Sequence, residues 1–244
     1  MASPARCALF IHGVACDHSV WARPAAALAA RGWQVLAPDL PGHGGGAAPA
    51  PASVQAGADW ALAQLPPTGP VALIGHSWGS LIALEAAARL GPRASHLALL
   101  GTASPMRVAP ALLDLAASAP EEALARIIRY AHSLPEDSAP AQQQLAMGLR
   151  VLRANPAQPL LLQGLQACDR YQDAEAALAA LACPLLFLTG SHDRMTPPAA
   201  AAALIAQARA TGLAVQAHEL PTGHDIEGEA PAQTLALLLS FLAT

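Results

Sequence analysis

The sequence predicts an α/β fold, with a mostly parallel six-stranded sheet, helices on both faces and one helical insertion. Three observations support this prediction. Short apolar runs alternate with longer helix-like segments along most of the chain. The 244 residues, 54% of them hydrophobic, suffice for one large domain with an extensive core. The alternation stops over residues 104–182, where helix-like segments follow one another without a strand between them.

Six apolar runs are expected to form the strands, near residues 7–12, 33–38, 70–75, 95–101, 183–189 and 214–220. Helices are expected near residues 21–31, 52–65, 78–90, 198–210 and 229–242. Right-handed crossovers leave the order of the strands little freedom. The strand at 33–38 should lie at an edge of the sheet, where its free backbone groups can pair with another chain.

The insertion contains four leucine-rich, helix-like segments separated by prolines, at 110–117, 120–132, 139–154 and 159–169. It leaves and rejoins the sheet at the carboxyl ends of strands, so we expect a helical cap over that end. The expected division is a core of residues 1–103 and 183–244 with a cap of residues 104–182. Most apolar side chains of the cap should pack within it, while Leu124 and Met147 are expected to line an apolar pocket.

The most informative local pattern is Gly-His-Ser-Trp-Gly at residues 75–79. It follows the apolar run at 71–74 and precedes a helix-like segment, so Ser77 should sit on a sharp turn between strand and helix. The glycines at both ends permit the close backbone approach that such a turn needs. The start of the helix supplies free N–H groups to a developing anion. The pattern predicts that Ser77 is a nucleophile.

A serine hydroxyl needs a base, and the base needs an acid to hold it. Asp193 follows the expected strand at 183–189, and His224 lies in the loop after the strand at 214–220. Both lie beyond the carboxyl ends of strands, where open α/β sheets place their ligands. We therefore expect His224 to be the base and Asp193 the acid. Asp225 remains an alternative acid.

Four other histidines are less favoured than His224 as the base. His192 belongs to a turn, and His218 falls inside a strand. His76 adjoins Ser77 and is expected to pack and hydrogen-bond there. His12, at a strand end, is expected to tie loops together.

The oxyanion of an acyl-transfer reaction needs two donors. We expect the backbone N–H of Trp78, which follows the nucleophile, and that of Val14, in the loop after the first strand, to supply them. The substrate pocket is expected to comprise Gly13, Ala15, Trp21, Leu124, Met147 and Met195.

Several segments together carry a resemblance: His12-Gly13 with Trp21, the stretch 38–44, the turn at 75–79, the stretch 190–193, and Gly223-His224. Over nearly its whole length the chain resembles the α/β-hydrolase superfamily. The resemblance implies the α/β-hydrolase fold and a Ser77, His224 and Asp193 triad in the family's chain order. Superfamily members usually begin with extra antiparallel strands, which this sequence is expected to lack. The chain is similar to pimeloyl-ester carboxylesterases and to the methylesterase and hydroxynitrile-lyase branch.

The resemblance also narrows the chemistry. Related dehalogenases and epoxide hydrolases carry an aspartate where Ser77 stands. Hydroxynitrile lyases carry a threonine where Gly13 stands and a lysine where Asp225 stands. A serine hydrolase cleaving short- to medium-chain carboxylic esters through an acyl-enzyme is therefore expected. The alternatives are a ligand-binding sensor with vestigial hydrolysis, or a small aminopeptidase or thioesterase of the same fold.

Composition excludes several other function classes. The net charge of −4 gives no sign of a nucleic-acid groove, and all thirteen basic residues are arginine, which excludes a Schiff-base lysine. The four cysteines show no metal-binding spacing, and no metal or cofactor is expected. No apolar run is long enough to span a membrane, and the start does not resemble a signal peptide. A cytoplasmic protein without a membrane partner is therefore expected.

A small-molecule ester is the expected partner. The pimeloyl-ester carboxylesterases present cap arginines to an acyl-carrier protein, and here arginines recur at helical spacing, at Arg126, Arg129, Arg150 and Arg153. The cap also carries carboxylates, at Glu121, Glu122, Glu136 and Asp137. A solvated face of mixed charge is therefore favoured over a carrier-binding face. The expected assembly is a monomer or a dimer paired through the edge strand.

Overall fold

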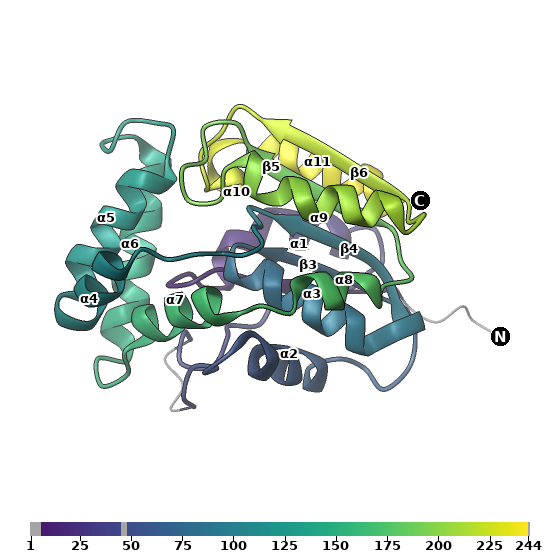
Figure 1. Cartoon of the computed structure of the whole chain (residues 1–244), viewed down its shortest axis with the longest axis horizontal. Coiled ribbons are helices and arrows are strands. Elements are labelled where there is room, and N and C mark those ends of the chain that lie inside the picture. The colour runs from purple at the N-terminus through teal and green to yellow at the C-terminus, as the bar shows by residue number, and fades with distance from the viewer. Residues whose placement is uncertain (1–5, 45–47, 244) are drawn as a thin grey trace.

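The computed structural model describes residues 6–44 and 48–243, and within them the chain forms one six-stranded parallel sheet (Figure 1). The strand order is β2-β1-β3-β4-β5-β6, and each neighbouring pair is parallel. The strands are β1 (Cys7–Ile11), β2 (Gln34–Leu36), β3 (Val71–His76), β4 (Ala94–Leu100), β5 (Leu185–Gly190) and β6 (Val215–Leu220). The predicted fold class is confirmed, and β2 occupies one edge.

Helices cover both faces of the sheet. One face carries α1 (Ala22–Ala29), α10 (Ile226–Glu229) and α11 (Pro231–Phe241). The other carries α2 (Val54–Ala63), α3 (Trp78–Leu90), α8 (Ala174–Ala179) and α9 (Pro198–Ala210). Two 3₁₀ turns, His18–Trp21 and Gly91–Arg93, precede α1 and β4.

Side chains of the central strands alternate between two apolar cores. Leu9 and Leu73 point to the core under α2 and α3, whereas Phe10 and Ile74 point to the core under α1 and α11. Because both faces are covered, these strands read as continuous apolar runs rather than alternating ones. The carboxyl ends of the strands therefore sit on a rigid platform.

Four helices, α4 (Pro110–Ser118), α5 (Pro120–Ala131), α6 (Ala139–Ala154) and α7 (Leu160–Arg170), form a cap at one end of the sheet (Figure 1). Proline in the first turn begins α4, α5 and α6, where its missing N–H costs nothing. The cap has its own apolar cluster, which includes Leu124, Ile128 and Leu161.

The position of α8 differs from the expected division of the chain, in which the cap extends to residue 182. Tyr171, Ala174 and Leu178 belong to the core under α3 rather than to the cap cluster, and α8 packs against α3 and α9. The Tyr171 hydroxyl donates to Glu85 on α3 at 2.7 Å. The chain thus returns to the core directly after α7, because the small apolar face of α8 fits between two core helices.

Two further boundaries differ from the prediction. The expected helix at 229–242 corresponds to α11, which begins at Pro231, and the short helix α10 before it was not predicted. The edge strand β2 has only three residues. In the described part of the chain, no helix combines the length and apolarity needed to cross a bilayer.

Candidate active site

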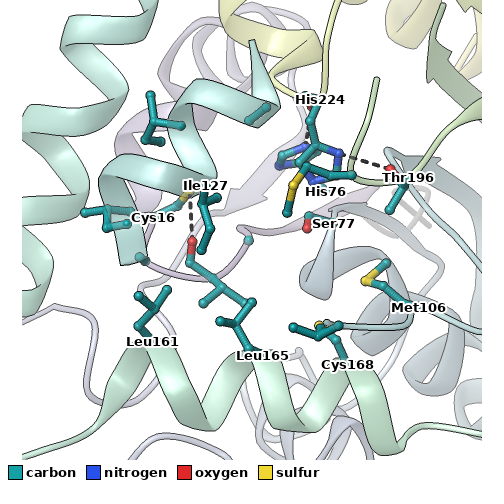
Figure 2. Close-up of a pocket in the computed structure, with 18 of the residues that line it drawn as sticks. Cys16, His76, Ser77, Met106, Ile127, Leu161, Leu165, Cys168, Thr196 and His224 are labelled. Carbon is teal, nitrogen blue, oxygen red and sulfur yellow. Dashed lines mark hydrogen bonds between the residues drawn. The ribbon is translucent and has the colours of Figure 1, made fainter. Parts of the chain in front are cut away.

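The turn that carries Ser77 is strained and closely packed. Ser77 has φ +54° and ψ −124°, a positive φ that non-glycine residues rarely adopt. A Cβ on Gly75 would lie 2.1 Å from the carbonyl oxygen of Gly79, and one on Gly79 would lie 2.2 Å from that of Ile11. Only glycine fits at both positions. The turn holds Ser77 against the cavity beneath the cap (Figure 2).

His224 and Asp193 come together beside Ser77. The Nδ1 of His224 lies 2.8 Å from Oδ2 of Asp193. Asp193 Oδ1 accepts the backbone N–H groups of Met195 and Thr196 at 2.7 and 2.8 Å, and Oδ2 also accepts the Thr196 hydroxyl at 2.7 Å. Because a carboxylate only accepts, this arrangement places the proton on Nδ1 and leaves Nε2 free to accept one.

The pKa values of this pair are separated by their mutual attraction. Burial by itself raises the pKa of Asp193, but the charge of His224 and the hydrogen bonds outweigh burial and lower that pKa to about 2. Burial by itself lowers the pKa of His224, and the Asp193 carboxylate more than compensates, so that pKa lies above its ordinary value. Asp193 is thus ionised at neutral pH and stabilises the protonated imidazole.

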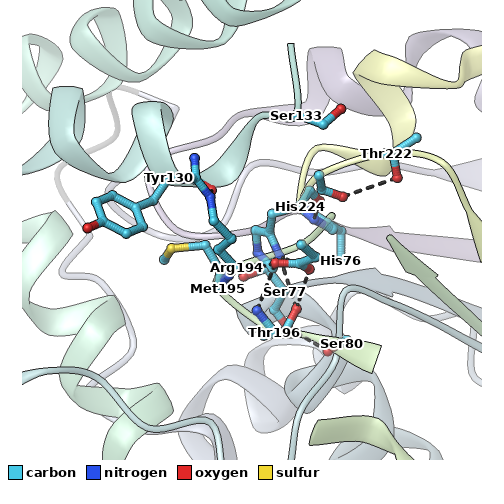
Figure 3. A network of polar contacts seen from close by, with 12 residues as sticks. His76, Ser77, Ser80, Tyr130, Ser133, Arg194, Met195, Thr196, Thr222 and His224 are labelled. Atoms are coloured by element: carbon cyan, nitrogen blue, oxygen red, sulfur yellow. Dashed lines mark hydrogen bonds and ion pairs between the residues drawn. The ribbon is translucent and has the colours of Figure 1, made fainter. Parts of the chain in front are cut away.

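Asp225, the alternative acid, does not bond to the ring of His224. Its carboxylate caps α10 by accepting the Gly228 N–H at 3.2 Å, and it lies 3.7 Å from Nε2 of His132. His192 and His218 are exposed. The structure therefore brings together the expected serine, histidine and aspartate. Figure 3 shows His224, Ser77 and Thr196 in one polar network.

Behind His224 lies a second buried pair, His76 and Glu227. The Nε2–H of His76 donates to the carbonyl oxygen of His224 at 2.8 Å, and the two rings are 4.8 Å apart. The Nδ1 of His76 lies 3.5 Å from Oε1 of Glu227. Neither carboxylate oxygen of Glu227 has a hydrogen-bond partner among the described residues. Sequence reasoning missed Glu227, because it lies in a short acidic stretch that is typical of a surface.

Burial shifts both members of this second pair toward their uncharged forms. It lowers the pKa of His76 to about 4, with the nearby His224 contributing, and raises the pKa of Glu227 to about 7. Burial and the neighbouring Glu227 raise the pKa of Asp225 to about 6. A protonated Glu227 can donate to Nδ1 of His76, whose Nε2–H then holds the backbone of His224. The observed hydrogen bond from His76 to the carbonyl of His224 holds the loop of His224 through a neutral ring.

The loop after β1 is held by His12. Its Nε2 accepts the Leu40 N–H at 2.9 Å, and Nδ1 donates to the carbonyl of Gly13 at 2.9 Å. Burial, with His43 nearby, lowers the pKa of His12 to about 3, so this ring is neutral. His12 thereby ties the Gly13 loop to residues 38–44. A Cβ on Gly13 would lie 3.3 Å from Cβ of Ser77.

The two expected oxyanion donors flank Ser77. Trp78 is the first residue of α3, and N–H groups in the first turn of a helix have no partner within the helix. Val14 lies in the loop held by His12 and lines the same cavity. Its carbonyl accepts the Cys16 thiol at 3.6 Å (Figure 2). Val14 thus lines the cavity that contains Ser77, and Trp78 directly follows Ser77 at the start of α3.

The cavity has a volume of about 80 Å³ and is mainly apolar. Besides Ser77 and His224, its lining includes Gly13, Val14, Ala15, Met106, Leu124, Ile127, Leu161, Leu165 and Met195. Cys16 and Cys168 also line it, but burial raises the pKa of both thiols far above neutrality. A protonated thiol is a weak nucleophile, which leaves Ser77 as the candidate.

Two of the expected pocket residues lie elsewhere. Trp21 is fully buried against the sheet, with its ring 5.2 Å from that of Phe10. Met147 faces away from the cavity, where its sulfur accepts the Ser19 hydroxyl at 3.7 Å. In α6 it is Gly148 that approaches Leu124. A shift of one residue turns a helical side chain by about 100°, and helical spacing alone did not identify the inward face.

We expect Glu227→Gln to gain stability over the wild type as the pH rises. The pKa of Glu227 is raised from 4.5 to about 7 on folding, so the folded state retains a proton that the unfolded state releases. Its stabilising effect is complete below pH 4.5 and is lost as the pH rises through about 7. Glutamine does not titrate. The difference in unfolding free energy should grow by about 1–3 kcal/mol across this window.

Denaturant unfolding at a series of pH values measures this difference. Glu219→Gln is the matched control, because Glu219 is exposed on β6. A Glu227→Gln difference that stays constant with pH contradicts a buried, uncharged Glu227.

Several known proteins are similar to this chain in sequence or in structure. A pimeloyl-[acyl-carrier protein] methyl ester esterase from Chromobacterium violaceum is 29% identical over 197 residues, covering 78% of this chain and 76% of that protein. The enol-lactonase from Burkholderia xenovorans LB400 superimposes with a TM-score of 0.81 at 22% identity, covering 99% and 93% of the two chains. An esterase from Exiguobacterium antarcticum gives 0.79 at 17% identity, covering 100% and 94%.

The family assignment rests on a match over most of the chain. The sequence model described as the alpha/beta hydrolase family matches residues 8–237. The match includes β1, the Ser77 turn, the cap and the loops of Asp193 and His224. The resemblance inferred from the sequence motifs is therefore confirmed, and the chain belongs to the alpha/beta hydrolase family.

Proposed function

We propose that this chain is a serine esterase that cleaves short- to medium-chain carboxylic esters through an acyl-enzyme. The observation that carries the proposal is the strained turn at Ser77, which lines one apolar cavity with His224, itself bonded to Asp193 at 2.8 Å. The name of the Chromobacterium violaceum relative as a methyl ester esterase supports the same reaction class.

Acylation begins when Nε2 of His224 takes the proton of the Ser77 hydroxyl. The oxygen attacks the ester carbonyl and forms a tetrahedral oxyanion, which accepts the N–H groups of Val14 and Trp78. Collapse of this intermediate breaks the ester bond. His224 returns the proton to the departing alcohol, and Asp193 remains ionised throughout.

Deacylation repeats these steps with water. His224 takes a proton from the water, whose oxygen attacks the acyl-enzyme carbonyl. The second tetrahedral intermediate collapses to release the carboxylic acid and restore the Ser77 hydroxyl. The same two backbone N–H groups, of Val14 and Trp78, stabilise the second oxyanion.

The alternatives receive less support from the cavity. An aminopeptidase that held a free amine would need a carboxylate near the scissile bond, and no Asp or Glu is among the described residues that line the cavity. A thioesterase would use the same machinery, so comparison of matched esters and thioesters distinguishes it. A sensor would release product very slowly, which turnover counts would reveal. We place the oxygen ester first.

We expect Ser77→Ala to reduce kcat for ester hydrolysis by about 10⁴-fold or more, because the remaining donors cannot replace the nucleophile. Hydrolysis of short nitrophenyl esters measures this, with circular dichroism to verify folding. Ser118→Ala, an exposed serine on α4, is the control. An organophosphonate should also add to Ser77 in the wild type. Retention of a tenth of the activity by folded Ser77→Ala contradicts the assignment.

We expect Asp193→Asn to reduce kcat by about 10³- to 10⁴-fold, because an amide no longer fixes the tautomer of His224. Asp225→Asn should retain activity within about tenfold, since Asp225 caps α10. In the wild type, kcat/KM should fall as the pH drops below a midpoint above 6.5, the ordinary histidine value, because the raised pKa of His224 governs the base. Reversal of the two effects assigns the acid to Asp225 instead.

We expect kcat/KM to rise with acyl length until the cavity is filled, and then to fall. Each added methylene should stabilise the transition state by roughly 1–3 kcal/mol during the rise. Ile127→Ala should move the optimum to longer chains, because Ile127 lines the cavity. Leu162→Ala, in the cap cluster but outside that lining, should not. A series of esters from acetate to decanoate measures the optimum of both variants. Activity that keeps rising to long-chain triglycerides, with activation at a lipid interface, would indicate a mobile lipase lid.

A further inference from the structure

A second, larger cavity adjoins the one that contains Ser77. Its volume is about 410 Å³, and it lies between α4, α5 and the loop after β5. The two cavities share five lining residues, namely Arg107, Val108, Ile127, Leu165 and Met195. A substrate bound at Ser77 that exceeds the smaller cavity therefore extends into the larger one. We call the larger cavity the outer cavity.

The outer cavity is rimmed by positive charge. Arg107 comes from the segment after β4, Arg126 from α5 and Arg194 from the loop after β5. No aspartate or glutamate is among the described residues that line it. Asp169, on α7, is bonded to the N–H of Val108 at 3.0 Å. Three arginines thus line one partly apolar space.

The other cap arginines are neutralised by carboxylates. Arg129 pairs with Glu136 at 2.6 Å, Arg150 with Asp17 at 2.6 Å and Arg153 with Glu121 at 2.7 Å. Within residues 6–44 and 48–243, neither Arg107 nor Arg126 forms an ion pair. The contrast separates the arginines of the outer cavity from those that form the mixed-charge face.

Arg194 is positioned by neutral groups. Its guanidinium donates to the carbonyl oxygens of Arg129 at 2.7 Å and Tyr130 at 3.3 Å. It also lies 4.9 Å from the centre of the Tyr130 ring (Figure 3). These contacts orient the side chain, and no carboxylate of the described residues forms an ion pair with it. A preorganised cation at the mouth of the site favours a negatively charged ligand.

We propose that the outer cavity binds a carboxylate at the end of the substrate remote from the scissile ester. The inference deepens the proposed esterase function, on which it rests. The substrate class is an ester that carries a second, ionised carboxyl group, separated from the ester by an apolar chain. That chain would pass Ile127, Leu165 and Met195, and the carboxylate would meet Arg126 and Arg194. A guanidinium fork matches a carboxylate in geometry as well as charge.

The carboxylate can belong to the acyl part or to the alcohol part of the ester. Monomethyl adipate and neutral methyl heptanoate test the acyl part. The acetyl ester of hydroxyhexanoate and neutral hexyl acetate test the alcohol part. In each pair the chain length is similar and the charge differs. We expect kcat/KM of the charged ester to exceed that of its neutral partner by about tenfold in one of the two pairs, with the gain in KM.

Arg126→Gln isolates the charge without touching Ser77 or the Asp193 loop. It should reduce kcat/KM for the preferred charged ester by roughly fivefold to tenfold and leave the neutral ester within about twofold. Arg126→Glu should reverse the preference. Arg153→Gln is the matched control, because it removes the same charge from an arginine paired with Glu121. Added salt should weaken the preference in the wild type.

Binding to Ser77→Ala, measured by calorimetry with monomethyl adipate and the acetyl ester of hydroxyhexanoate, tests the cavity without catalysis. Equal kcat/KM and equal binding for charged and neutral esters, unchanged by Arg126→Glu, overturn the inference while Ser77-dependent hydrolysis leaves the esterase intact. If no ester is hydrolysed, the esterase assignment is overturned. Charge-selective binding would then still support a carboxylate site in the outer cavity. If Arg126→Glu impairs only carrier-linked esters, the arginines serve an acidic carrier protein and the inference is also overturned.

Discussion

The contact on which the candidate site depends is the near touch between the Ser77 turn and the end of β1. With glycine at position 79, the backbone of α3 approaches the carbonyl oxygen of Ile11 so closely that a Cβ would lie only 2.2 Å from it. This approach sets the start of α3 beside the loop of Gly13, and Ser77, next to α3, has a positive φ. The buried strand β3 and the buried first turn of α3 on either side of Ser77 hold this strained conformation. The candidate nucleophile and the candidate oxyanion donors therefore depend on the same packing contact.

Burial acts on the charged groups around His224 in two opposite ways. Asp193 has four acceptor contacts, to His224, to the hydroxyl of Thr196 and to two backbone N–H groups, and it stays ionised. Glu227 is equally enclosed but lacks such donors, and its pKa rises to about 7. Two carboxyl groups near one imidazole thus carry different charges because their hydrogen-bond environments differ. Asp193 can stabilise a positively charged imidazole, whereas Glu227 lies next to His76, whose ring holds the backbone of His224.

Local pattern predicts the fold and singles out Ser77, Asp193 and His224 as candidates, since each follows a strand of the parallel sheet. It did not identify Glu227, because its role depends on enclosure by segments distant in the chain. Helical spacing also does not identify which side of α6 faces inward, and Met147, expected in the substrate pocket, does not line the cavity of Ser77. Trp21 is expected in the substrate pocket, but its side chain belongs to the core under α1 and α11. Tertiary contacts decide these points, and no local signal encodes them.

The cap is fastened to the candidate site at the end of α5. The last carbonyls of a helix have no partner within it, and here residues from both active-site loops supply the donors. Arg194, next to Asp193, donates to the carbonyl oxygens of Arg129 and Tyr130, and the backbone N–H of His224 donates to the carbonyl oxygen of Ala131. The positive charge of Arg194 also suits the negative end of the helix dipole. A cap motion that broke these contacts would disturb the loops of Asp193 and His224 together, so the end of α5 and these two loops are structurally coupled.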